Sequence, residues 1–250
     1  MTELVAPFYL NWSFWAVIVS FLAIVLSQLP PIHVLLRPKS LQTEVHNRAH
    51  LTHKVGNPNI GMFVKITNTG GRAVRVQRLK ISLLRGSKPI ASIPAKAYVS
   101  LQEKPSPIIF LPFTLKPEAE WAYRVNFYSD FERSTDITFR KSASALDEEI
   151  GRLLGERSES DKAAVRASDV FLEPFNAMFN QLFIWKPGEY TLKLIIETSP
   201  HVPQDGKEYR FTIYESDTEM LKKEIEDYPT GCGITFNNYD RHPGLSIELS

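Results

Sequence analysis

The stretch "IGMFVKITNTGG", residues 60–71, decides the fold class. Its apolar residues alternate with other residues at Met62, Val64 and Ile66, and an Asn-Thr-Gly-Gly run follows. A period of two is that of a β-strand with one buried face, and Asn and Gly are typical turn residues. The stretch therefore predicts a strand that ends in a tight turn.

Similar patterns recur along the chain. Further strand candidates are "RAVRVQRLKISLLRG" (72–86), "PIIFLPFTL" (107–115), "EAEWAYRVNFYSD" (118–130), "GEYTLKLIIETS" (188–199) and "KEYRFTIYES" (207–216). In the first of these, the apolar set changes phase between Val76 and Leu79, which predicts a bulge or a break near Gln77 and Arg78. Many short strands separated by Pro and Gly turns predict a mainly β fold, a β-sandwich.

Three of these phrases resemble the strand–turn phrases of immunoglobulin-like modules of the CARDB type. They are "FVKITNTGG" (63–71), "PFTLKPEAEWAYRVNF" (112–127) and "KPGEYTLKLIIET" (186–198). The resemblance covers roughly residues 41–140 and 185–215. It implies an immunoglobulin-like sandwich and assigns no functional residues, because such phrases recur on sandwich folds of unrelated function.

A helical insertion, residues 141–184, interrupts the predicted sandwich domain, which spans 41–228. In "SALDEEIGRLLG", Ser144 and Asp147 form a capping box and Gly155 ends the helix. "VFLEPFNAMFNQLF" (170–183) has apolar residues at helical spacing, which favours a helix that closes one end of the sandwich over a docking surface for a partner or a membrane. A last helix begins at Ser216 with Glu219 in its capping box. The tail, 229–250, has no assignment.

The N-terminal segment, residues 1–31, contains an uncharged run from Phe8 to Leu29. As a helix this run is about 33 Å long at roughly 1.5 Å per residue, which is enough to cross a bilayer. A buried core helix would show a polar face, and a signal peptide would begin with basic residues, so both fit less well. The run predicts one transmembrane helix, over about 8–29, followed by a juxtamembrane linker at 32–40.

The charges that flank this run predict its orientation. Arg37, Lys39 and Arg48 follow it, whereas Glu3 is the only charged side chain before it. The positive-inside rule then places the N-terminus outside and the large domain in the cytoplasm. The single cysteine, Cys232, excludes an intramolecular disulfide and agrees with a reducing compartment.

Small residues recur at steps of three and four within the uncharged run. They are Ser13, Ala16, Ser20, Ala23 and Ser27. This spacing places them in one stripe of a helix, and small side chains allow membrane helices to approach closely. The stripe predicts a helix-packing face for a second copy of the chain or for another membrane protein, and the alternative is chance.

The overall charge is balanced, with 29 Lys and Arg against 28 Asp and Glu, so a nucleic-acid partner is not expected. Between residues 72 and 88 the basic residues have no acid among them: Arg72, Arg75, Arg78, Lys80, Arg85 and Lys88. This basic face fits lipid headgroups, a phosphorylated ligand or an acidic partner. The favoured alternative is a solvated strand face matched by the chain's own acidic helices.

Residues that could carry chemistry are few. His46, His50 and His53 could bind a metal if they lay on one helix face, but a strand would place His53 opposite the other two. Cys232, with Asp240 and His242 nearby, lacks the positioned base and oxyanion site of a nucleophilic triad. The chain has no phosphate-binding Gly loop and no hydrolase or zinc-protease motif. We therefore expect no catalytic residues, metal or cofactor.

These observations predict a single-pass membrane protein whose β-sandwich domain binds a ligand or partner as a non-enzymatic subunit of a membrane assembly. The alternative is a membrane effector whose domain senses a signal and whose helices oligomerise to perturb the bilayer. A third and more distant possibility is an enzyme with an unrecognised site.

Overall fold

The computed structural model describes residues 11–28, 37–100, 106–157, 163–203 and 206–250. Ten strands in these ranges form one antiparallel sheet. They are β1 (Leu41–Lys54), β2 (Asn57–Asn68), β3 (Val74–Arg85), β4 (Lys88–Val99), β5 (Pro107–Ile109), β6 (Phe113–Leu115), β7 (Glu120–Tyr128), β8 (Gly188–Ser199), β9 (Glu208–Ile213) and β10 (Leu245–Glu248). The prediction of a mainly β fold is confirmed.

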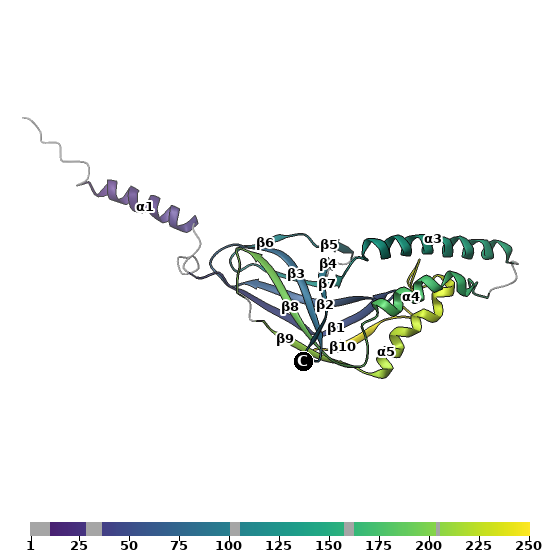
Figure 1. Ribbon diagram of the computed structural model, residues 1–250. Helices are drawn as coiled ribbons and strands as arrows, with labels where there is room; N and C mark the ends of the chain where they lie inside the picture. Colours follow the sequence, from purple (N-terminus) through teal and green to yellow (C-terminus); the bar gives the residue numbers. More distant parts are fainter. Residues whose placement is uncertain (1–10, 29–36, 101–105, 158–162, 204–205) are drawn as a thin grey trace, which may run out of the picture.

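The sheet is nearly closed (Figure 1). Its strand order is β10-β1-β2-β7-β4-β3-β8-β9, with β5 beside β4 and β6 beside β3. The two end strands meet, because Arg210 of β9 and Ser250, just after β10, exchange backbone hydrogen bonds of 2.8 and 3.0 Å. Closure satisfies backbone groups that an open edge would leave unpaired.

Strand β4 joins the two halves of the sheet. Its first part, up to Pro94, pairs with β3, and its second part, from Ala95, pairs with β7. Pro94 has no backbone N–H to donate, so a change of partner here loses little hydrogen bonding. Two halves that share one crossing strand are compatible with the predicted sandwich.

The strand predicted from the alternation at Met62, Val64 and Ile66 folds as its pattern predicts. Met62, Val64 and Ile66 are buried on the inner face of β2. The buried Asn68 side chain then organises the turn, since its Nδ2 donates to the Arg72 and Leu115 carbonyls. The predicted bulge in β3 is also confirmed, because its pairing with β8 shifts between Val76 and Arg78. "PIIFLPFTL" instead divides into β5 and β6, which pair with different strands.

The core fills the interior of the closed sheet and extends under the helices. The largest fully buried side chains are Trp185, Tyr190, Tyr228, Phe127, Phe175, Leu51, Ile60, Met62, Ile66, Leu79, Ile81 and Leu83. The Tyr190 hydroxyl donates to backbone carbonyls of residues 184 and 186 and accepts from the Lys186 N–H at 3.0 Å. These bonds fix the chain where it enters β8.

Three helices gather at one end of the sheet: α3 (Arg133–Glu156), α4 (Glu173–Leu182) and α5 (Glu215–Lys222). Short 3-10 helices η2 (Asp169–Phe171) and η3 (Lys223–Thr230) adjoin α4 and α5. Helix α4 buries Phe175, Met178 and Phe179, and the Phe179 ring lies 5.3 Å from that of His53 on β1. The apolar face of α4 therefore covers this end of the sheet.

Two helix starts differ from the sequence-based expectation. Helix α3 begins at Arg133, so Ser144 lies inside it rather than at its N-cap. Helix α5 begins at Glu215, and Asp217 rather than Glu219 accepts the hydrogen bond of the capping box, from the Tyr214 N–H at 2.9 Å. In both cases the helix begins where the chain leaves the preceding strand.

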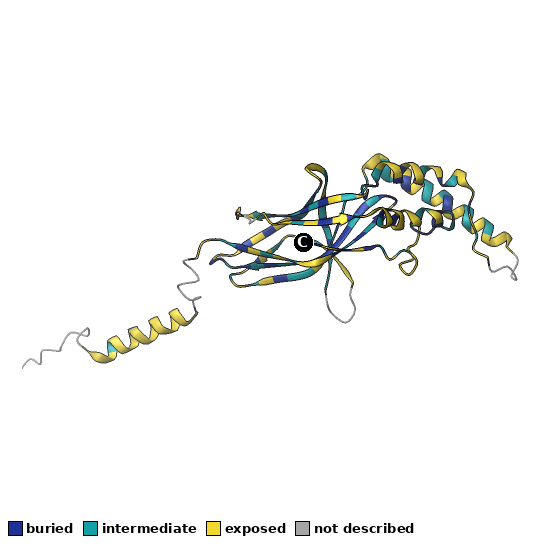
Figure 2. Cartoon of the chain, turned by 90° about the horizontal axis from the view of Figure 1, so that it is seen from below, coloured by how far each residue is buried: buried dark blue, intermediate teal, exposed yellow. Residues whose placement is uncertain are grey.

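Helix α1 (Trp12–Gln28) has 17 residues, and Figure 2 shows it in the colour of exposed residues along most of its length. Within the ranges described above, no helix is both long enough and apolar enough to cross a membrane. The transmembrane helix predicted over 8–29 is therefore not supported. The described helix is shorter than predicted, and residues 8–10 and 29 lie outside the described residues. Of the predicted linker, residues 32–36 also lie outside them.

The tail without an assignment is part of the sheet. Residues 245–248 form β10, which pairs with Arg48–Leu51 of β1. The Leu249 N–H adds a hydrogen bond of 2.7 Å to the Asn47 carbonyl. The chain from 231 to 244 must therefore cross the helical end of the sheet to reach β1.

Gly56, in the β1–β2 turn, provides a test of how α4 docks. Its φ is +82°, and a Cβ there would lie 2.8 Å from the Phe179 carbonyl oxygen. Gly56→Ala should lower the free energy of unfolding by about 3 kcal/mol, since it adds overpacking to a left-handed conformation. Gly86→Ala has a similar φ of +59° but open space around it, so it should cost only about 1 kcal/mol. Urea denaturation of the full chain in detergent measures both, and equal losses would contradict the close packing of α4.

Candidate functional site

A pocket of about 790 Å³ lies at the helical end of the sheet. It is lined by the end of β1, the start of β2, the end of β7, α3, η3 and the chain from 234 to 244. Helix α1 lies at the other end of the sheet (Figure 1). Strand β1 has 14 residues, so it separates the two ends by about 45 Å at roughly 3.3 Å per residue. We call this cavity the end pocket.

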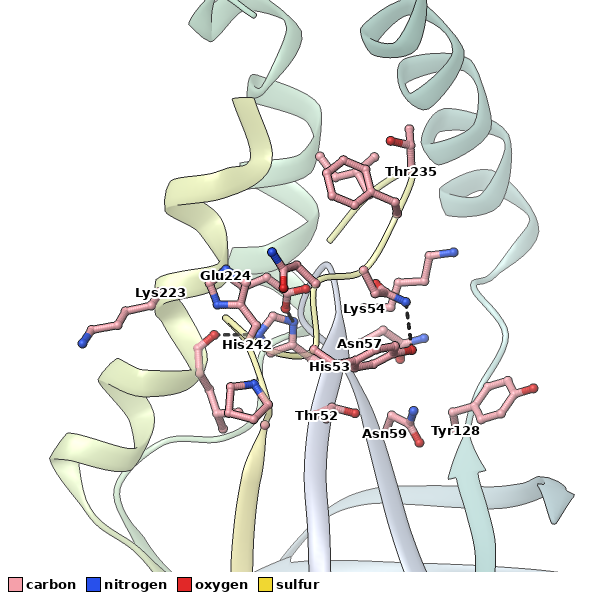
Figure 3. A pocket seen from close by; sticks show the side chains of 18 of the residues that line it. Thr52, His53, Lys54, Asn57, Asn59, Tyr128, Lys223, Glu224, Thr235 and His242 are labelled. Atoms are coloured by element: carbon pink, nitrogen blue, oxygen red, sulfur yellow. Dashed lines mark hydrogen bonds and ion pairs between the residues drawn. The ribbon is translucent and has the colours of Figure 1, made fainter. Parts of the chain in front are cut away.

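Two titratable side chains meet at the base of the end pocket (Figure 3). The Nε2 of His53 lies 2.8 Å from the Leu221 carbonyl oxygen, so this nitrogen carries a proton and donates. The Nδ1 of His53 accepts from the Gly56 N–H at 3.3 Å and also lies 3.3 Å from Oε2 of Glu224. A neutral His53 thus presents a lone pair to the Glu224 carboxyl group.

Burial favours the neutral forms of both groups. It lowers the pKa of His53, whose side chain is almost fully enclosed. The pKa of Glu224 is raised to about 7, mainly by burial; the nearby His242 lowers it and the Asp227 carboxylate raises it. A protonated Glu224 can donate its proton to Nδ1 of His53. At neutral pH and below, the contact is therefore a hydrogen bond between neutral groups rather than an ion pair.

Asp227 fastens the segment above the pocket. Its Oδ2 lies 2.7 Å from Nε of Arg241 and 2.7 Å from Nε2 of His242, both of which donate to it. The Asp227 side chain is only 5% exposed, and it joins η3 to the loop before β10. A buried carboxylate with two donors is a strong attachment, because removal of either partner leaves it underbonded.

The Gly-Cys-Gly sequence has a backbone role. Gly231 and Gly233 have φ angles of +86° and +79°, and a Cβ at either would lie within 2.7 Å of a Thr235 or Glu224 oxygen. Cys232 between them is buried, and burial raises the pKa of its thiol. His242 bonds to Asp227 rather than to Cys232. This geometry provides a tight turn rather than an activated nucleophile.

The three histidines of β1 do not converge. His46 is exposed, His50 is half-buried beside Pro243, and His53 lies in the end pocket. Val45 and Ala49 pair with the buried Val64 and Met62, so the irregularity between them keeps the phase of the strand. The buried His53 therefore lies on the opposite face of β1 from His46 and His50, as a strand predicts. Over the described ranges, no group of three or more His, Cys, Asp or Glu side chains could hold a metal ion.

The basic face lies on the outer surface of β3 and the segments that flank it, away from the end pocket. Arg78 and Lys80 contact Glu197 of β8 at 3.7 and 2.7 Å, and the hydrogen bond from Lys80 lowers the pKa of Glu197. The acid that meets these bases therefore comes from the neighbouring strand and not from an acidic helix. Arg72, Arg75, Arg85 and Lys88 are exposed.

The stripe of small residues lies along α1 and is exposed throughout. The Ser27 hydroxyl donates to the Ile24 carbonyl within the helix at 2.7 Å. No described contact brings this stripe to the end pocket, which lies at the other end of the sheet.

Comparison with known proteins adds little. No protein-family model matches the sequence, and the search of curated proteins gives no match. Among solved structures, a protein from Archaeoglobus fulgidus is 10% identical, with a TM-score of 0.25, over 69% of this chain and 94% of that chain. A similarity at this level carries no argument about fold or function, so the site must be interpreted from its own geometry.

Most residues of the end pocket give no signal in the sequence. The sequence indicates His53 as a candidate metal ligand, whereas no pattern marks Asn59, Glu224 or the neighbouring Asp227. Glu224 and Asp227 lie in an acidic segment that looks like solvated surface. They become a site only because the chain returns over them between 231 and 244.

The neutral His53–Glu224 contact predicts how stability responds to pH. Between pH 4.5 and about 7 the folded state retains a proton on Glu224 that the unfolded state releases. This group therefore makes the free energy of unfolding fall as pH rises through that window. His53 acts with the opposite sign below pH 6.5, since the unfolded state then binds a proton that the folded state does not.

A Glu224→Gln variant separates the two effects, because its amide can donate to His53 at every pH. The free energy of unfolding of the variant minus that of the wild type should be about 2 kcal/mol larger at pH 8 than at pH 5. Glu226→Gln, a change at an exposed carboxylate of the same segment, is the control and should shift stability by less than about 0.5 kcal/mol at either pH. Parallel pH profiles for wild type and Glu224→Gln would show that Glu224 is ionised throughout.

Proposed function

We propose that this chain is a non-enzymatic, membrane-anchored binding protein whose β domain takes a ligand or partner into the end pocket. The observation that carries the proposal is the pocket itself. Its volume is about 790 Å³, and it is lined by the ends of β1, β2 and β7, by α3, α5 and η3, and by the loop that Asp227 fastens. Ligand sites are characteristically concave, with a few fixed polar groups at their base. His53 and Glu224 are such groups.

Binding is favoured over catalysis by how the reactive side chains are engaged. Both ring nitrogens of His53 have partners within the protein, and His242 is held by Asp227. A general base needs a nitrogen or oxygen within reach of a substrate proton, and a nucleophile needs such a base beside it. Cys232 is buried and its raised pKa disfavours the thiolate.

The anchor is proposed from the sequence around α1. No charged side chain occurs from Phe8 to Leu29, and the described helix within that run exposes large apolar side chains such as Val19, Phe21 and Ile24. Exposed apolar surface of this kind is stable in lipid. In this proposal the N-terminus lies outside and the domain, with an immunoglobulin-like arrangement, lies in the cytoplasm. An active periplasmic phosphatase fused after Ser250 would contradict that orientation.

A photocrosslinker at the mouth of the pocket tests the binding function. Tyr239 lines the pocket and is 69% exposed, so benzoylphenylalanine can replace it in the full chain. Irradiation in the host membrane should give an adduct at residue 239, whose mass distinguishes a small ligand from a protein partner. The control site is Leu154, which is exposed near the end of α3 and does not line the pocket. Absence of an adduct at 239, or equal labelling at both sites, would contradict the proposal.

The small-residue stripe of α1 gives a second test, of assembly. Ser20→Leu or Ala23→Leu should reduce helix association without preventing insertion, because Leu is apolar but holds the backbones apart. The steric effect should exceed the loss of an interhelical hydroxyl bond, which averages about 0.6 kcal/mol in membrane proteins. Val17→Leu and Leu22→Val are the controls on other faces. Equal crosslinking of stripe and control variants, in the isolated segment and in the full chain, would leave α1 as a plain anchor.

A further inference from the structure

Charges in the wall of the end pocket compensate each other. Among the residues that line it, the basic ones are Lys54, Arg140, Lys223 and Arg241, and the acidic ones are Asp130, Asp136, Glu226 and the neutral Glu224 described above. The buried Asp227, which bonds to Arg241, adds a negative charge beneath the wall. Several are paired within the protein: Arg140 with Asp136 at 2.8 Å and Arg241 with the buried Asp227 at 2.7 Å. The Lys54 ammonium lies 4.7 Å from the centre of the Phe139 ring. A ligand with several charges, such as a nucleotide, finds no excess of opposite sign here.

Neutral hydrogen-bonding groups supply most of the remaining polar wall. The pocket is lined by the amides Asn57, Asn59, Asn237 and Asn238 and by the hydroxyls Thr52, Tyr128, Ser129, Thr235 and Tyr239. Amides and hydroxyls each offer both a donor and an acceptor. They therefore suit a ligand whose own groups also donate and accept.

Asn59 carries an unsatisfied polar atom in this wall. Its Oδ1 is buried and has no hydrogen-bond partner in the part of the chain that the structure describes. An unsatisfied buried acceptor costs about 1–3 kcal/mol. Removing this oxygen should therefore cost the fold little, which makes Asn59 a suitable position at which to test binding.

Aromatic rings stand at the opening. Phe236 and Tyr239, both in the loop before β10, line the pocket and are 52% and 69% exposed. Apolar surface exposed at ligand-binding grooves can be formed by such side chains. The face of an aromatic ring carries partial negative charge and attracts C–H groups, which carry partial positive charge.

We propose that the end pocket binds a neutral carbohydrate. This inference rests on the binding function proposed above and names the ligand class. A sugar ring carries hydroxyls around its edge, which donate to and accept from amides, and C–H groups on its faces, which pack on Phe236 and Tyr239. A nucleoside base could also stack on these rings, but it brings fewer groups for the amide wall.

The test uses the full chain in lipid nanodiscs and isothermal titration calorimetry. The probes are maltotriose, cellotriose, mannobiose, galactobiose and chitotriose, with adenosine and uridine for the nucleoside class. At least one of the sugars should bind saturably and more tightly than either nucleoside. Replacing Phe236 or Tyr239 with Ala should weaken that binding at least tenfold.

Asn59→Leu separates a binding role from a structural one. It removes the unsatisfied oxygen, so the melting temperature should stay equal or rise while sugar affinity falls at least tenfold. Asn180→Leu, on the exposed face of α4 and outside the pocket, should leave the affinity unchanged. Sugar binding that survives Asn59→Leu would overturn the assignment of this residue and of the pocket.

The results also distinguish this inference from the proposed function. If an adduct forms at residue 239 but no sugar binds, or a nucleoside binds more tightly, the ligand is not a carbohydrate. The proposed binding function is then still supported by the adduct. No adduct and no binding of any probe overturns both.

Discussion

Closure of the sheet by its last strand is the constraint on which the site depends. The Ser250 backbone bonds to Arg210 of β9, and β10 pairs with β1. The C-terminal residues therefore link the two edges of the sheet. The chain enters this strand from η3, at the helical end. It therefore crosses the open end of the sheet between 231 and 244 and becomes one wall of the end pocket. The pairing of β10 with β1 thus helps to form the end pocket at the helical end of the sheet.

The groups beneath this wall differ because their partners differ. Asp227 faces Arg241 and His242 at 2.7 Å, so its buried carboxylate has two donors. Glu224 faces a histidine whose own pKa burial lowers, and the pKa of Glu224 rises to about 7. Desolvation disfavours charge at both acids, but only Asp227 has a cationic partner within hydrogen-bond distance among the described contacts. The Asp227 carboxylate fastens the loop, and the Glu224 carboxyl group is an uncharged group at the bottom of the pocket.

The compensated wall, the unsatisfied amide and the exposed rings are the basis of the proposed recognition function. The pocket lies at the end of the sheet away from α1, and in the proposed arrangement it faces away from the membrane. A ligand at this end would contact β1, β2 and the loop before β10 together.

The strands with clear alternation were predictable, and the elements around the site were not. Met62, Val64 and Ile66 define β2 by period alone, and the phase change near Gln77 defines the bulge of β3. Strand β4 contains two prolines and β1 is largely polar, so neither shows a strong strand pattern, and their pairing depends on neighbouring strands. Helix α3 starts before the expected cap and has no side-chain cap, whereas α5 is capped by Asp217 instead of Glu219.

The sequence by itself determined the mainly β class, the inner faces of several strands, the turn after β2 and the uncharged N-terminal run, because each is a property of consecutive residues. Only the tertiary structure decided the closure of the sheet and the end pocket. Asn59, Glu224 and His242 are far apart in the chain and carry no shared local pattern. They meet because β1 pairs with both β2 and β10, and contacts between distant segments depend on which edges pair, a choice that no local periodicity encodes.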